Sequence, residues 1–367
     1  MGNKRSIFLY PLSLIYGIIT AIRNFLFKTN LISSREFRIP VICVGNLAVG
    51  GTGKTPHTEY LAGLLKKEFR VAVLSRGYKR KSSGFLYADK NSTVRDIGDE
   101  PLQIFRKFPD VTVAVDSNRV RGVETILSGK PDTGVIILDD AYQHRRITPG
   151  FSILLSEFSN LMIKDHMLPY GNLRESISNM SRADIILITK SPENISPIDR
   201  RIIVKEIGKA PYQNLYFTSL TYQEPVPVFD DCRDKQAHPL FKAGDDNQET
   251  GIVLVTGIAG PQPLLEYMKK NVSEIFHISF GDHHYYKEKD IDRIIEAWDN
   301  LKSPERFIVT TEKDAVRLRE FANIAEPGRS ALYYIPIGIK FLNDDQEEFD
   351  NLIIDYVRKN KRNNRIS

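Results

Sequence analysis

Cysteine is almost absent from this chain: its 367 residues include only Cys43 and Cys232. The two cysteines lie far apart in the sequence, and neither belongs to a C-x-x-C pair or a His/Cys cluster. The sequence therefore predicts neither a disulfide scaffold nor a structural zinc site. This scarcity of cysteine is typical of a protein that works in a reducing cytosol.

A strong charge bias is also missing, since 51 Lys and Arg residues face 46 Asp and Glu residues and leave a net charge of +5. This excess is too small to predict nucleic-acid binding, but it is compatible with an anionic membrane or substrate. Because 41% of the residues are hydrophobic, with 19 Phe and 16 Tyr, a largely disordered chain is excluded. The length suits about two folded domains.

Long apolar runs are missing except at the amino terminus, where SIFLYPLSLIYGIITAIRNFLF spans residues 6–27. The stretch from Ser6 to Ile22 has no charge and is about the shortest helix that crosses a bilayer. On a helix, one stripe is polar or small and the remaining surface is Ile, Leu and Phe. The stripe consists of Ser6, Tyr10, Ser13, Gly17, Thr20 and Asn24. The pattern predicts a helix that lies in or enters the cytoplasmic leaflet of a membrane.

Three alternatives remain open for this segment. A full transmembrane span is long enough only at the lower limit, and Pro11 and Gly17 weaken it. A buried helix of a soluble domain has a similar composition. A secretory signal peptide also combines basic residues with an apolar run, but no small-x-small cleavage site follows here.

From Arg38 onward, short β-branched runs alternate with helix-length segments. Continuous apolar strands of this kind are buried on both faces, and their spacing predicts right-handed βαβ units. The expected fold class is therefore α/β with a doubly wound sheet. The runs are IPVICVGNL, VAVLSRG, VTVAV, GVIILDDA, FSILLSE and ADIILITK.

Residues 221–251 interrupt this alternation with a stretch rich in Pro, Asp and Gln, which indicates a linker or an excursion. Beyond it the alternation resumes, so a second, smaller α/β domain is expected. The basic end VRKNKRNNRIS is interpreted as a solvated tail, with weak attraction to anionic lipid as the alternative. The predicted parts are the N-terminal membrane-associated helix at 1–28, a P-loop nucleotide-binding domain at 29–222 and a smaller domain with a basic tail at 223–367.

A glycine-rich loop follows the first apolar strand, where VICVGNL leads into AVGGTGKTP and a helix-like segment. This order is the context of a phosphate-binding P-loop, whose glycines let backbone N–H groups face phosphate oxygens. We expect Lys54 to contact the β- and γ-phosphates of ATP and the Thr55 hydroxyl to bind Mg²⁺. The expected nucleotide-binding residues are Ala48, Val49, Gly50, Gly51, Thr52, Gly53, Lys54 and Thr55.

Ala48 breaks the G-x-x-x-x-G-K-[ST] pattern at its first position, so a glycine-rich turn without a ligand is the alternative. A second feature favours a nucleotide, because the apolar strand GVIIL ends at Asp139 and Asp140. A carboxylate at the end of a second strand is the usual partner of P-loop Mg²⁺. Asp139 is the preferred metal ligand, while Asp140 either shares that role or caps the following turn.

Several motifs together resemble the tetraacyldisaccharide 4'-kinase family, the lipid A kinases of Gram-negative bacteria. The resemblance covers nearly the full chain, from the N-terminal helix to about residue 320. The motifs are VGNLAVGGTGKTP, SRGY at 75–78, GDEP at 98–101, LDDAYQHRR, GNLRE at 171–175, FGDHHYY at 280–286 and VTTEKDAVRL.

The resemblance implies a P-loop kinase-like doubly wound sheet, a second, smaller α/β domain and an N-terminal membrane-associated helix at the cytoplasmic face of the inner membrane. It implies ATP and Mg²⁺ as cofactors and transfer of the γ-phosphate to the 4'-hydroxyl of a tetraacylated glucosamine disaccharide 1-phosphate, the lipid A disaccharide precursor. No nucleic acid is expected as a partner, and no protein partner can be inferred.

Catalytic roles follow from the same resemblance. Asp99 is the expected base, Glu100 a ligand of the metal or of its water shell, and Arg119 a cation that neutralises charge during transfer. His283 is expected to meet Asp99 across the cleft between the two domains and to share the proton. The residues alone leave an alternative for each role. GDE is also typical of a helix N-cap, and Arg119 could form a surface salt bridge. His283 could be a loop histidine that packs or caps.

Substrate contacts are expected from Tyr78, His144, Asn172 and Arg174, because an arginine can hold the 1-phosphate or an acyl carbonyl. The basic run at 79–81 adjoins Tyr78 and suits anionic headgroups, with ordinary loop charge as the alternative. An exposed histidine without a role is the alternative for His144.

Two other functions compete with a kinase. A P-loop GTPase or metal-insertion ATPase is suggested by ITK at 188–190 and TEKD at 311–314, although neither has the Asn-Lys-x-Asp order. A nucleotide-gated membrane-binding module without catalysis is the second, and it would leave Asp99 and His283 without a task.

Overall fold

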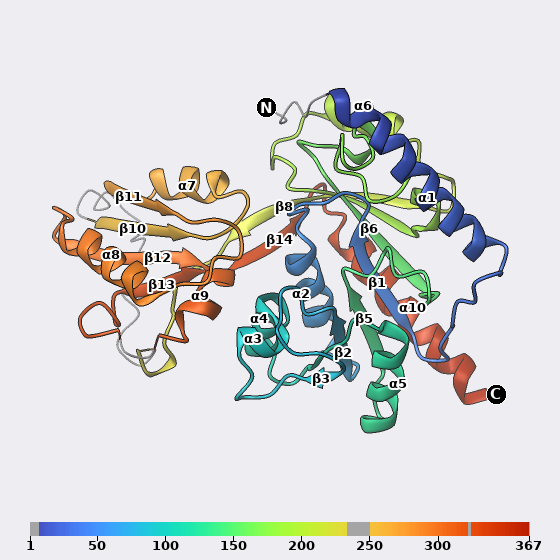
Figure 1. Cartoon of the computed structure of the whole chain (residues 1–367), viewed down its shortest axis with the longest axis horizontal. Helices are drawn as coiled ribbons and strands as arrows, with labels where there is room; N and C mark the ends of the chain where they lie inside the picture. The colour runs from blue at the N-terminus through green and yellow to red at the C-terminus, as the bar shows by residue number, and fades with distance from the viewer. Residues whose placement is uncertain (1–6, 233–249, 322–323, 367) are drawn as a thin grey trace. The chain divides into compact units, whose positions relative to one another are not determined.

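The computed structural model describes residues 7–232, 250–321 and 324–366, which form two compact units (Figure 1). Unit 1 comprises Met1–Ile97, Ile104–Leu220 and Ile339–Ser367, and unit 2 comprises Gly98–Gln103 and Thr221–Gly338. Two segments therefore depart from the predicted boundaries. Residues 98–103 belong to the smaller unit, and residues 339–367 belong to the larger one.

Unit 1 is built on a nine-stranded sheet in the order β14-β8-β7-β6-β1-β5-β2-β4-β3. The pairs from β8 to β4 are parallel, and β3 is antiparallel to β4. This is the doubly wound α/β fold that the sequence predicts. The strands are β1 (Val41–Asn46), β2 (Val71–Ser75), β3 (Leu86–Tyr87), β4 (Thr112–Val115), β5 (Val135–Asp139), β6 (Phe151–Glu157), β7 (Ile185–Thr189), β8 (Asn214–Tyr222) and β14 (Ile337–Phe341).

Helices cover both faces of this sheet, because alternate strand residues point into two separate cores. In β1, Cys43 belongs to the core with α5 and α6, whereas Ile42 and Val44 belong to the core with α2 and α10. All six residues of β1 are buried, as expected for a central parallel strand. The helices of unit 1 are α1 (Tyr10–Lys28), α2 (Lys54–Leu65), α3 (Val94–Ile97), α4 (Asp99–Lys107), α5 (Arg119–Gly129), α6 (Pro197–Ile207) and α10 (Gln346–Ile366), with short 3₁₀ helices η1 (Ile7–Leu9), η2 (Met162–Lys164) and η3 (Ile177–Arg182); α4 begins in unit 2.

Unit 2 has a five-stranded sheet in the order β11-β10-β12-β13-β9, parallel except for β9. Its core is also divided between two faces: α8 and α9 pack on Val253 and Val255 of β10, and α7 packs on Ile252 and Leu254. The second α/β unit predicted from the sequence is therefore present. Its elements are β9 (Val226–Pro227), η4 (Asp230–Cys232), β10 (Thr250–Thr256), α7 (Gln262–Lys269), β11 (Glu274–Ser279), α8 (Glu288–Asp299), β12 (Glu305–Thr311), α9 (Glu312–Leu318) and β13 (Leu332–Ile335).

The C-terminal segment forms α10 of the larger unit and is not a solvated tail over its whole length. Phe349, Ile353 and Val357 lie one turn apart and are buried in the core that also contains α2. Arg358, inside the basic stretch, pairs with Glu68 of the same unit. The apolar spacing of α10 explains why this segment returns to the nine-stranded sheet.

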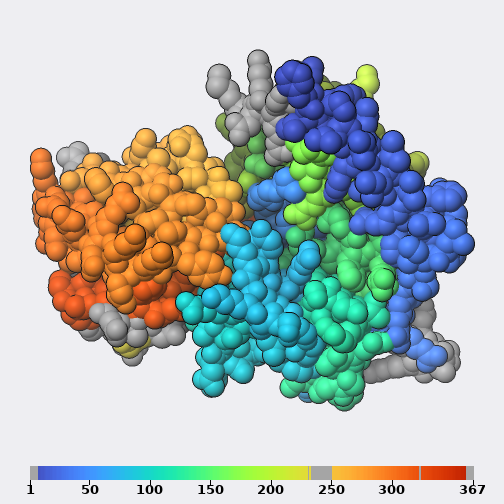
Figure 2. Space-filling view, viewed as in Figure 1, coloured from blue at the N-terminus to red at the C-terminus, as the bar shows by residue number. Residues whose placement is uncertain are grey.

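The N-terminal helix α1 lies on the surface of unit 1 (Figure 2), and part of its polar stripe is buried while most of its apolar residues are exposed. Ser13 and Thr20 are buried, whereas ten large hydrophobic residues of this segment are exposed. The alternative of a buried core helix is therefore wrong for α1. By length and composition, residues 7–28 form the one helix among the described residues that is long and apolar enough to cross a membrane. The exposed residues are Ile7, Phe8, Tyr10, Leu12, Leu14, Ile15, Ile18, Ile19, Ile22 and Phe25.

Candidate nucleotide and catalytic sites

The glycine-rich loop connects β1 to α2, as the sequence predicts. Gly50 and Gly53 have φ angles of 119° and 84°, a backbone region that side chains with a Cβ rarely adopt. Gly53 forms the N-cap of α2, which begins at Lys54, so the free N–H groups of the first helical turn lie beside the loop. An anion at this position would meet both these donors and the positive end of the helix dipole.

A second segment pairs with this loop from outside the strand–loop–helix unit. The Val49 N–H donates to the Asn172 carbonyl at 2.8 Å, and the Arg174 N–H donates to the Leu47 carbonyl at 2.7 Å. Between these bonds, Ala48 and Leu173 form an antiparallel bridge. Ala48, the departure from the P-loop pattern, therefore lies in a short ladder with the GNLRE motif.

Three predicted site residues meet at the end of this ladder. The Lys54 ammonium lies 3.7 Å from an Asp140 carboxylate oxygen, and Arg174 approaches the same carboxylate at 3.4 Å. Asp140 has a φ of 46°, which turns the chain sharply after β5. Its carboxylate is directed at the two cations, so the structure gives no support to a capping role for Asp140.

Asp139 is buried and hydrogen-bonded on both carboxylate oxygens. The Thr58 hydroxyl donates to Oδ1 at 3.0 Å and the Ser75 hydroxyl to Oδ2 at 3.3 Å. Arg119 is buried as well, and its guanidinium donates to the Asp116 carbonyl at 2.6 Å and to the Asp139 carbonyl at 3.3 Å. Arg119 is therefore not a surface salt bridge. Burial lowers its pKa to about 10, and it remains a cation at neutral pH.

His144 is half-buried near these arginines and is not an exposed loop residue. Burial, followed by the charges of Arg119 and Arg146, lowers its pKa to about 4, so the imidazole is neutral at pH 7. Its buried Nε2 has no hydrogen-bond partner among the described residues. An unpartnered buried nitrogen is suited to receive a group from a bound molecule. Tyr78, by contrast, is exposed, and the Lys79 ammonium lies 5.8 Å from its ring centroid.

His57 supports the phosphate loop, a role that the sequence analysis missed. One ring nitrogen, Nδ1, lies 2.7 Å from the Gly53 carbonyl and must donate to it, while Nε2 lies 3.0 Å from the Thr218 hydroxyl and accepts from it. Burial lowers the pKa of His57 to about 4, so it is neutral at pH 7. The helical spacing could have revealed this role, because His57 and Thr58 lie one turn beyond Gly53 and Lys54 on the same face of the helix.

In unit 2, Asp99 and His283 are in contact. His283 Nδ1 lies 2.9 Å from Asp99 Oδ2, and the same oxygen accepts from the buried guanidinium of Arg317. The Lys313 ammonium lies 3.1 Å from His283 Nε2 and 3.4 Å from Glu100. Asp99 was expected in the first domain, but residues 98–103 belong to the same unit as His283.

The cations around Asp99 keep its carboxylate ionised. Burial by itself would raise the pKa, but the His283 hydrogen bond and the charges of Lys313 and Arg317 outweigh it and hold the pKa well below its usual range. Asp99 also starts α4, and its Oδ1 accepts from the Glu100 N–H at 3.0 Å. The helix-start and side-chain contacts therefore coexist in one residue. Lys313 and Arg317 belong to the VTTEKDAVRL motif, but the sequence did not indicate what they contact.

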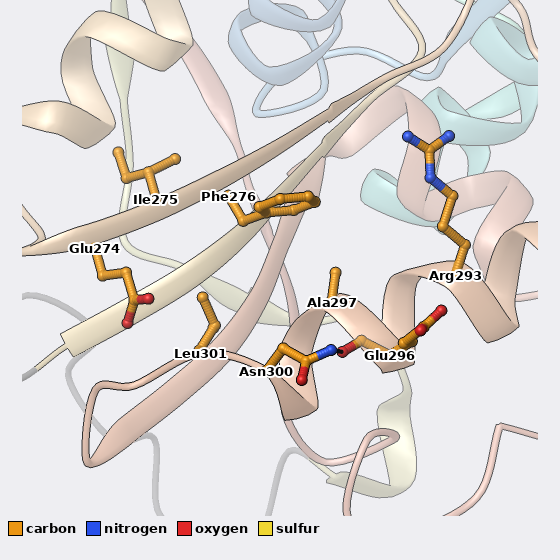
Figure 3. A pocket seen from close by; sticks show the side chains of 8 residues that line it. All are labelled: Glu274, Ile275, Phe276, Arg293, Glu296, Ala297, Asn300 and Leu301. Carbon is orange, nitrogen blue, oxygen red and sulfur yellow. Dashed lines mark hydrogen bonds between the residues drawn. The ribbon is translucent and has the colours of Figure 1, made fainter.

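Unit 2 also contains a pocket of about 460 Å³ between β11 and α8, lined by Phe276, Arg293, Glu296 and neighbouring residues (Figure 3). None of the predicted site residues lines this pocket. Glu274 at its edge is occupied, because one of its oxygens accepts from the Lys302 and Ser303 N–H groups and the Ser303 hydroxyl. The chemistry-bearing residues therefore lie elsewhere.

A doubly wound sheet whose first strand leads through a glycine-rich loop into a helix, with Lys54 beside the strand-end Asp140, defines a P-loop nucleotide-binding protein. The structure also argues against TEKD as the guanine-binding motif of a GTPase. These residues lie in unit 2, and Asp314 is buried against Thr311, Arg317 and the Gly257 N–H.

Comparison with known proteins identifies the family. The family model described as "Tetraacyldisaccharide-1-P 4'-kinase" matches residues 5–358, and the chain therefore belongs to this family. It is 48% identical over 363 residues to a tetraacyldisaccharide 4'-kinase of Bacteroides thetaiotaomicron, covering 98% of this chain and 95% of that protein. It is 45% identical over 376 residues to the enzyme of the same name from Phocaeicola vulgatus, covering 100% of both.

A solved structure agrees with these relatives. The "apo" form of LpxK from Aquifex aeolicus in complex with ATP matches with a TM-score of 0.69 and 27% identity, covering 95% of this chain and 98% of that one. The family, the α/β fold and the kinase class predicted from the sequence are thus confirmed. The roles of individual site residues stay predictions.

The neutrality of His57 predicts how stability depends on pH. Its folded pKa of about 4 lies below the ordinary value of 6.5, so the unfolded chain binds the proton more tightly. The contribution is complete above pH 6.5 and is lost as the pH falls toward 4. We expect it to amount to about 2 kcal/mol between pH 7.5 and pH 5.

Urea unfolding of the wild type and of His57→Asn measures this term. Asn retains an N–H donor for Gly53 but does not titrate, so its free energy of unfolding should change less over this pH range. Equal pH dependence in the two proteins would show that the pKa of His57 is the same in the folded and unfolded chain, contrary to this account.

Proposed function

We propose that this protein transfers the γ-phosphate of ATP to the 4'-hydroxyl of a tetraacylated glucosamine disaccharide 1-phosphate, at the cytoplasmic face of the inner membrane. The observation that carries the proposal is the Lys54–Asp140 contact at the end of a P-loop, in a chain whose family match spans residues 5–358. The family name indicates the lipid disaccharide as the phosphate acceptor, and the P-loop indicates a nucleoside triphosphate as the phosphate donor.

The phosphate chain of ATP would lie on the loop between β1 and α2. Backbone N–H groups of residues 50–55 and the N-terminus of α2 provide fixed dipoles, and Lys54 provides the mobile charge. Since phosphoryl transfer requires mainly positioning and charge stabilisation, buried cations near the loop are the expected catalytic groups. Arg119 suits this role because burial fixes its guanidinium beside the end of β5.

The residues at the strand ends also suit Mg²⁺. This ion prefers oxygen ligands and takes only one or two carboxylates besides water and phosphate oxygens. Thr55 at the start of α2 and the pair Asp139 and Asp140 offer such donors, whereas Glu100 belongs to unit 2 beside Lys313. When bound, the ion would neutralise charge on the phosphates. The Lys54–Asp140 contact keeps an oxygen ligand and the phosphate-binding lysine together.

Asp99 and His283 would act together on the acceptor hydroxyl. A carboxylate held well below its usual pKa is a weak base, but it can accept a hydrogen bond from His283 Nδ1–H and fix the ring. Kinases commonly use an aspartate to orient the attacking hydroxyl, and the proton leaves late in a loose transition state. We assign the pair, as one unit, to hydroxyl orientation and proton acceptance.

The lipid would be held by cations and neutral donors around the loop. Arg174 carries a guanidinium fork next to Asp140, and the neutral His144 offers an unpartnered Nε2. Asn172 is occupied, because its amide donates to Asp165 at 3.0 Å and its carbonyl accepts from Val49. Its contribution is therefore to shape the loop. Tyr78 lies on the surface, where an acyl chain or headgroup can reach it.

The outward apolar face of α1 supports membrane attachment. Exposed Ile, Leu and Phe side chains would be costly in water, and bilayer burial contributes roughly 25 cal/mol per Å². ATP is a cytosolic metabolite, which supports the cytoplasmic leaflet as the surface that the helix would meet.

Lys54→Ala is expected to remain folded and to lose most turnover, by at least about 10²-fold, because one phosphate-binding charge is removed. Lys66→Ala, at the other end of α2 and paired on the surface with Asp110, is the matched control and should retain activity. The measurement is the rate of lipid phosphorylation with ATP, and with GTP in parallel. Near-normal turnover by Lys54→Ala, or a preference for GTP, would contradict the proposal.

Asp99→Ala and His283→Ala should each lower kcat strongly while ATP binding survives. If the two residues act as a unit, the double variant loses little more than either single variant. The control is His284→Ala, because His284 is paired instead with Asp290. The measurement is kcat for the wild type, both single variants, the double variant and the control. Fully additive losses of activation free energy in the double variant would show that Asp99 and His283 work independently.

Replacing the outward residues Ile15, Ile18 and Ile22 by Ser should lower the fraction of protein that sediments with anionic vesicles at least about tenfold. The control is Ile198→Ser, an isoleucine that is more exposed than the three residues of α1 but lies on α6. Unchanged sedimentation of the triple variant would refute attachment through this face of α1.

A further inference from the structure

The polar stripe of α1 is connected to the nucleotide loop through residues 165–175. We propose that Ser13, Tyr16 and Glu175 are positioning residues that couple the seating of α1 on a lipid surface to nucleotide binding. The inference rests on the proposed function, since it requires both ATP and a membrane, and it assigns to the inward face of α1 a task beyond anchoring.

The first link runs from α1 to the segment at 165–175. The Ser13 hydroxyl donates to the Met167 carbonyl at 3.0 Å and accepts from the Tyr170 N–H at 2.8 Å. One turn further on, the Tyr16 hydroxyl donates to the Arg174 carbonyl at 3.1 Å. Ser13 is buried although it lies in a helix whose apolar residues are exposed. The hydrogen bonds therefore hold the helix against this segment.

An ion pair completes this link. Arg23 of α1 and Arg182 both contact Glu175, whose side chain is fully buried. Arg182 also donates to the Tyr142 carbonyl at 2.9 Å and lies over the Tyr142 ring. A buried carboxylate between two guanidinium groups has a fixed position, because leaving either charge unpaired inside the protein is costly. Glu175 thus joins α1 to the chain that follows the strand-end aspartates.

The second link runs from the segment to the loop. Asn172 and Arg174 supply the backbone partners of Val49 and Leu47, on either side of the Ala48–Leu173 bridge. The Arg174 side chain contacts Asp140, which in turn lies beside Lys54. The Arg174 carbonyl therefore accepts from α1, its N–H donates to the loop and its guanidinium contacts Asp140 of the site. A shift of α1 relative to residues 165–175 would be transmitted to the loop within this single residue.

The bilayer provides the differential contact that coupling requires. In water, the outward face of α1 is solvated and only polar contacts, which compete with water, hold its inward face. On a membrane, the apolar face is fixed and water leaves the surroundings, so the same polar contacts strengthen. Membrane binding and nucleotide binding should consequently favour the same arrangement of residues 47–49.

Coupling of this kind is reciprocal, since each ligand must change the affinity of the other by the same factor. The probes are phosphatidylglycerol vesicles without any disaccharide lipid, and a non-hydrolysable ATP analogue with Mg²⁺. For the full-length wild type, we expect vesicles to lower the Kd of the analogue about five- to tenfold, and the analogue to raise the vesicle partition constant by the same factor.

The test variant is Ser13→Ala combined with Tyr16→Phe, which removes the hydroxyls but keeps the outward apolar face. Its coupling factor should fall to near one, while both binding events persist. Tyr10→Phe on the same helix is the matched control, since the Tyr10 hydroxyl has no hydrogen bond among the described residues, and it should behave as the wild type. Glu175→Gln, checked for folding by circular dichroism, should also reduce the factor. If these hydroxyls had only a structural role, the double variant would be less stable but its coupling factor would equal that of the wild type.

The outcomes separate the inference from the proposed function. Vesicle and analogue binding that are both measurable but independent in the wild type would overturn the coupling alone, as would an unchanged factor in the double variant. A wild type that binds no analogue, or no vesicles, would overturn the coupling together with the corresponding part of the proposed function.

Discussion

The pairing of residues 47–49 with 172–174 is the contact on which the rest of the site depends. A P-loop needs glycines to bend toward phosphate, and such a loop loses more conformational freedom on folding than an ordinary one. Here two backbone hydrogen bonds and the Ala48–Leu173 bridge hold its first half, and His57 and the Asn46–Thr52 hydrogen bond hold its second half. Preorganised donors of this kind are what phosphoryl transfer requires of the protein.

Electrostatics divide the site residues into two groups. Asp99 is kept charged, because His283, Lys313 and Arg317 outweigh the effect of burial on its pKa. His57 and His144 are kept neutral, because burial lowers the pKa of each to about 4. Neutral imidazoles can serve as hydrogen-bond donors or acceptors without adding charge beside the phosphates, and an ionised aspartate can fix a neighbouring ring.

Local patterns predicted much of the fold and part of the site. The apolar strands, the glycine loop and the strand-end aspartates are contiguous in sequence, so periodicity and spacing revealed them. Contacts between distant segments were not accessible: the sequence did not indicate that Asp99 folds with unit 2, that α10 returns to the first sheet, or that Asn172 pairs with Val49. The polar stripe of α1 was visible, but the direction in which it points is decided by buried partners such as Glu175.

The central claim is that a lipid disaccharide receives the phosphate which the P-loop holds. The most direct measurement is ³¹P NMR of the lipid recovered after incubation of the protein with ATP, Mg²⁺ and a tetraacylated glucosamine disaccharide 1-phosphate in mixed micelles. The account predicts a second phosphate monoester on the lipid, at the 4' position, formed in proportion to the ADP released. ADP release with an unmodified lipid, or a phosphate at any other position, would contradict it.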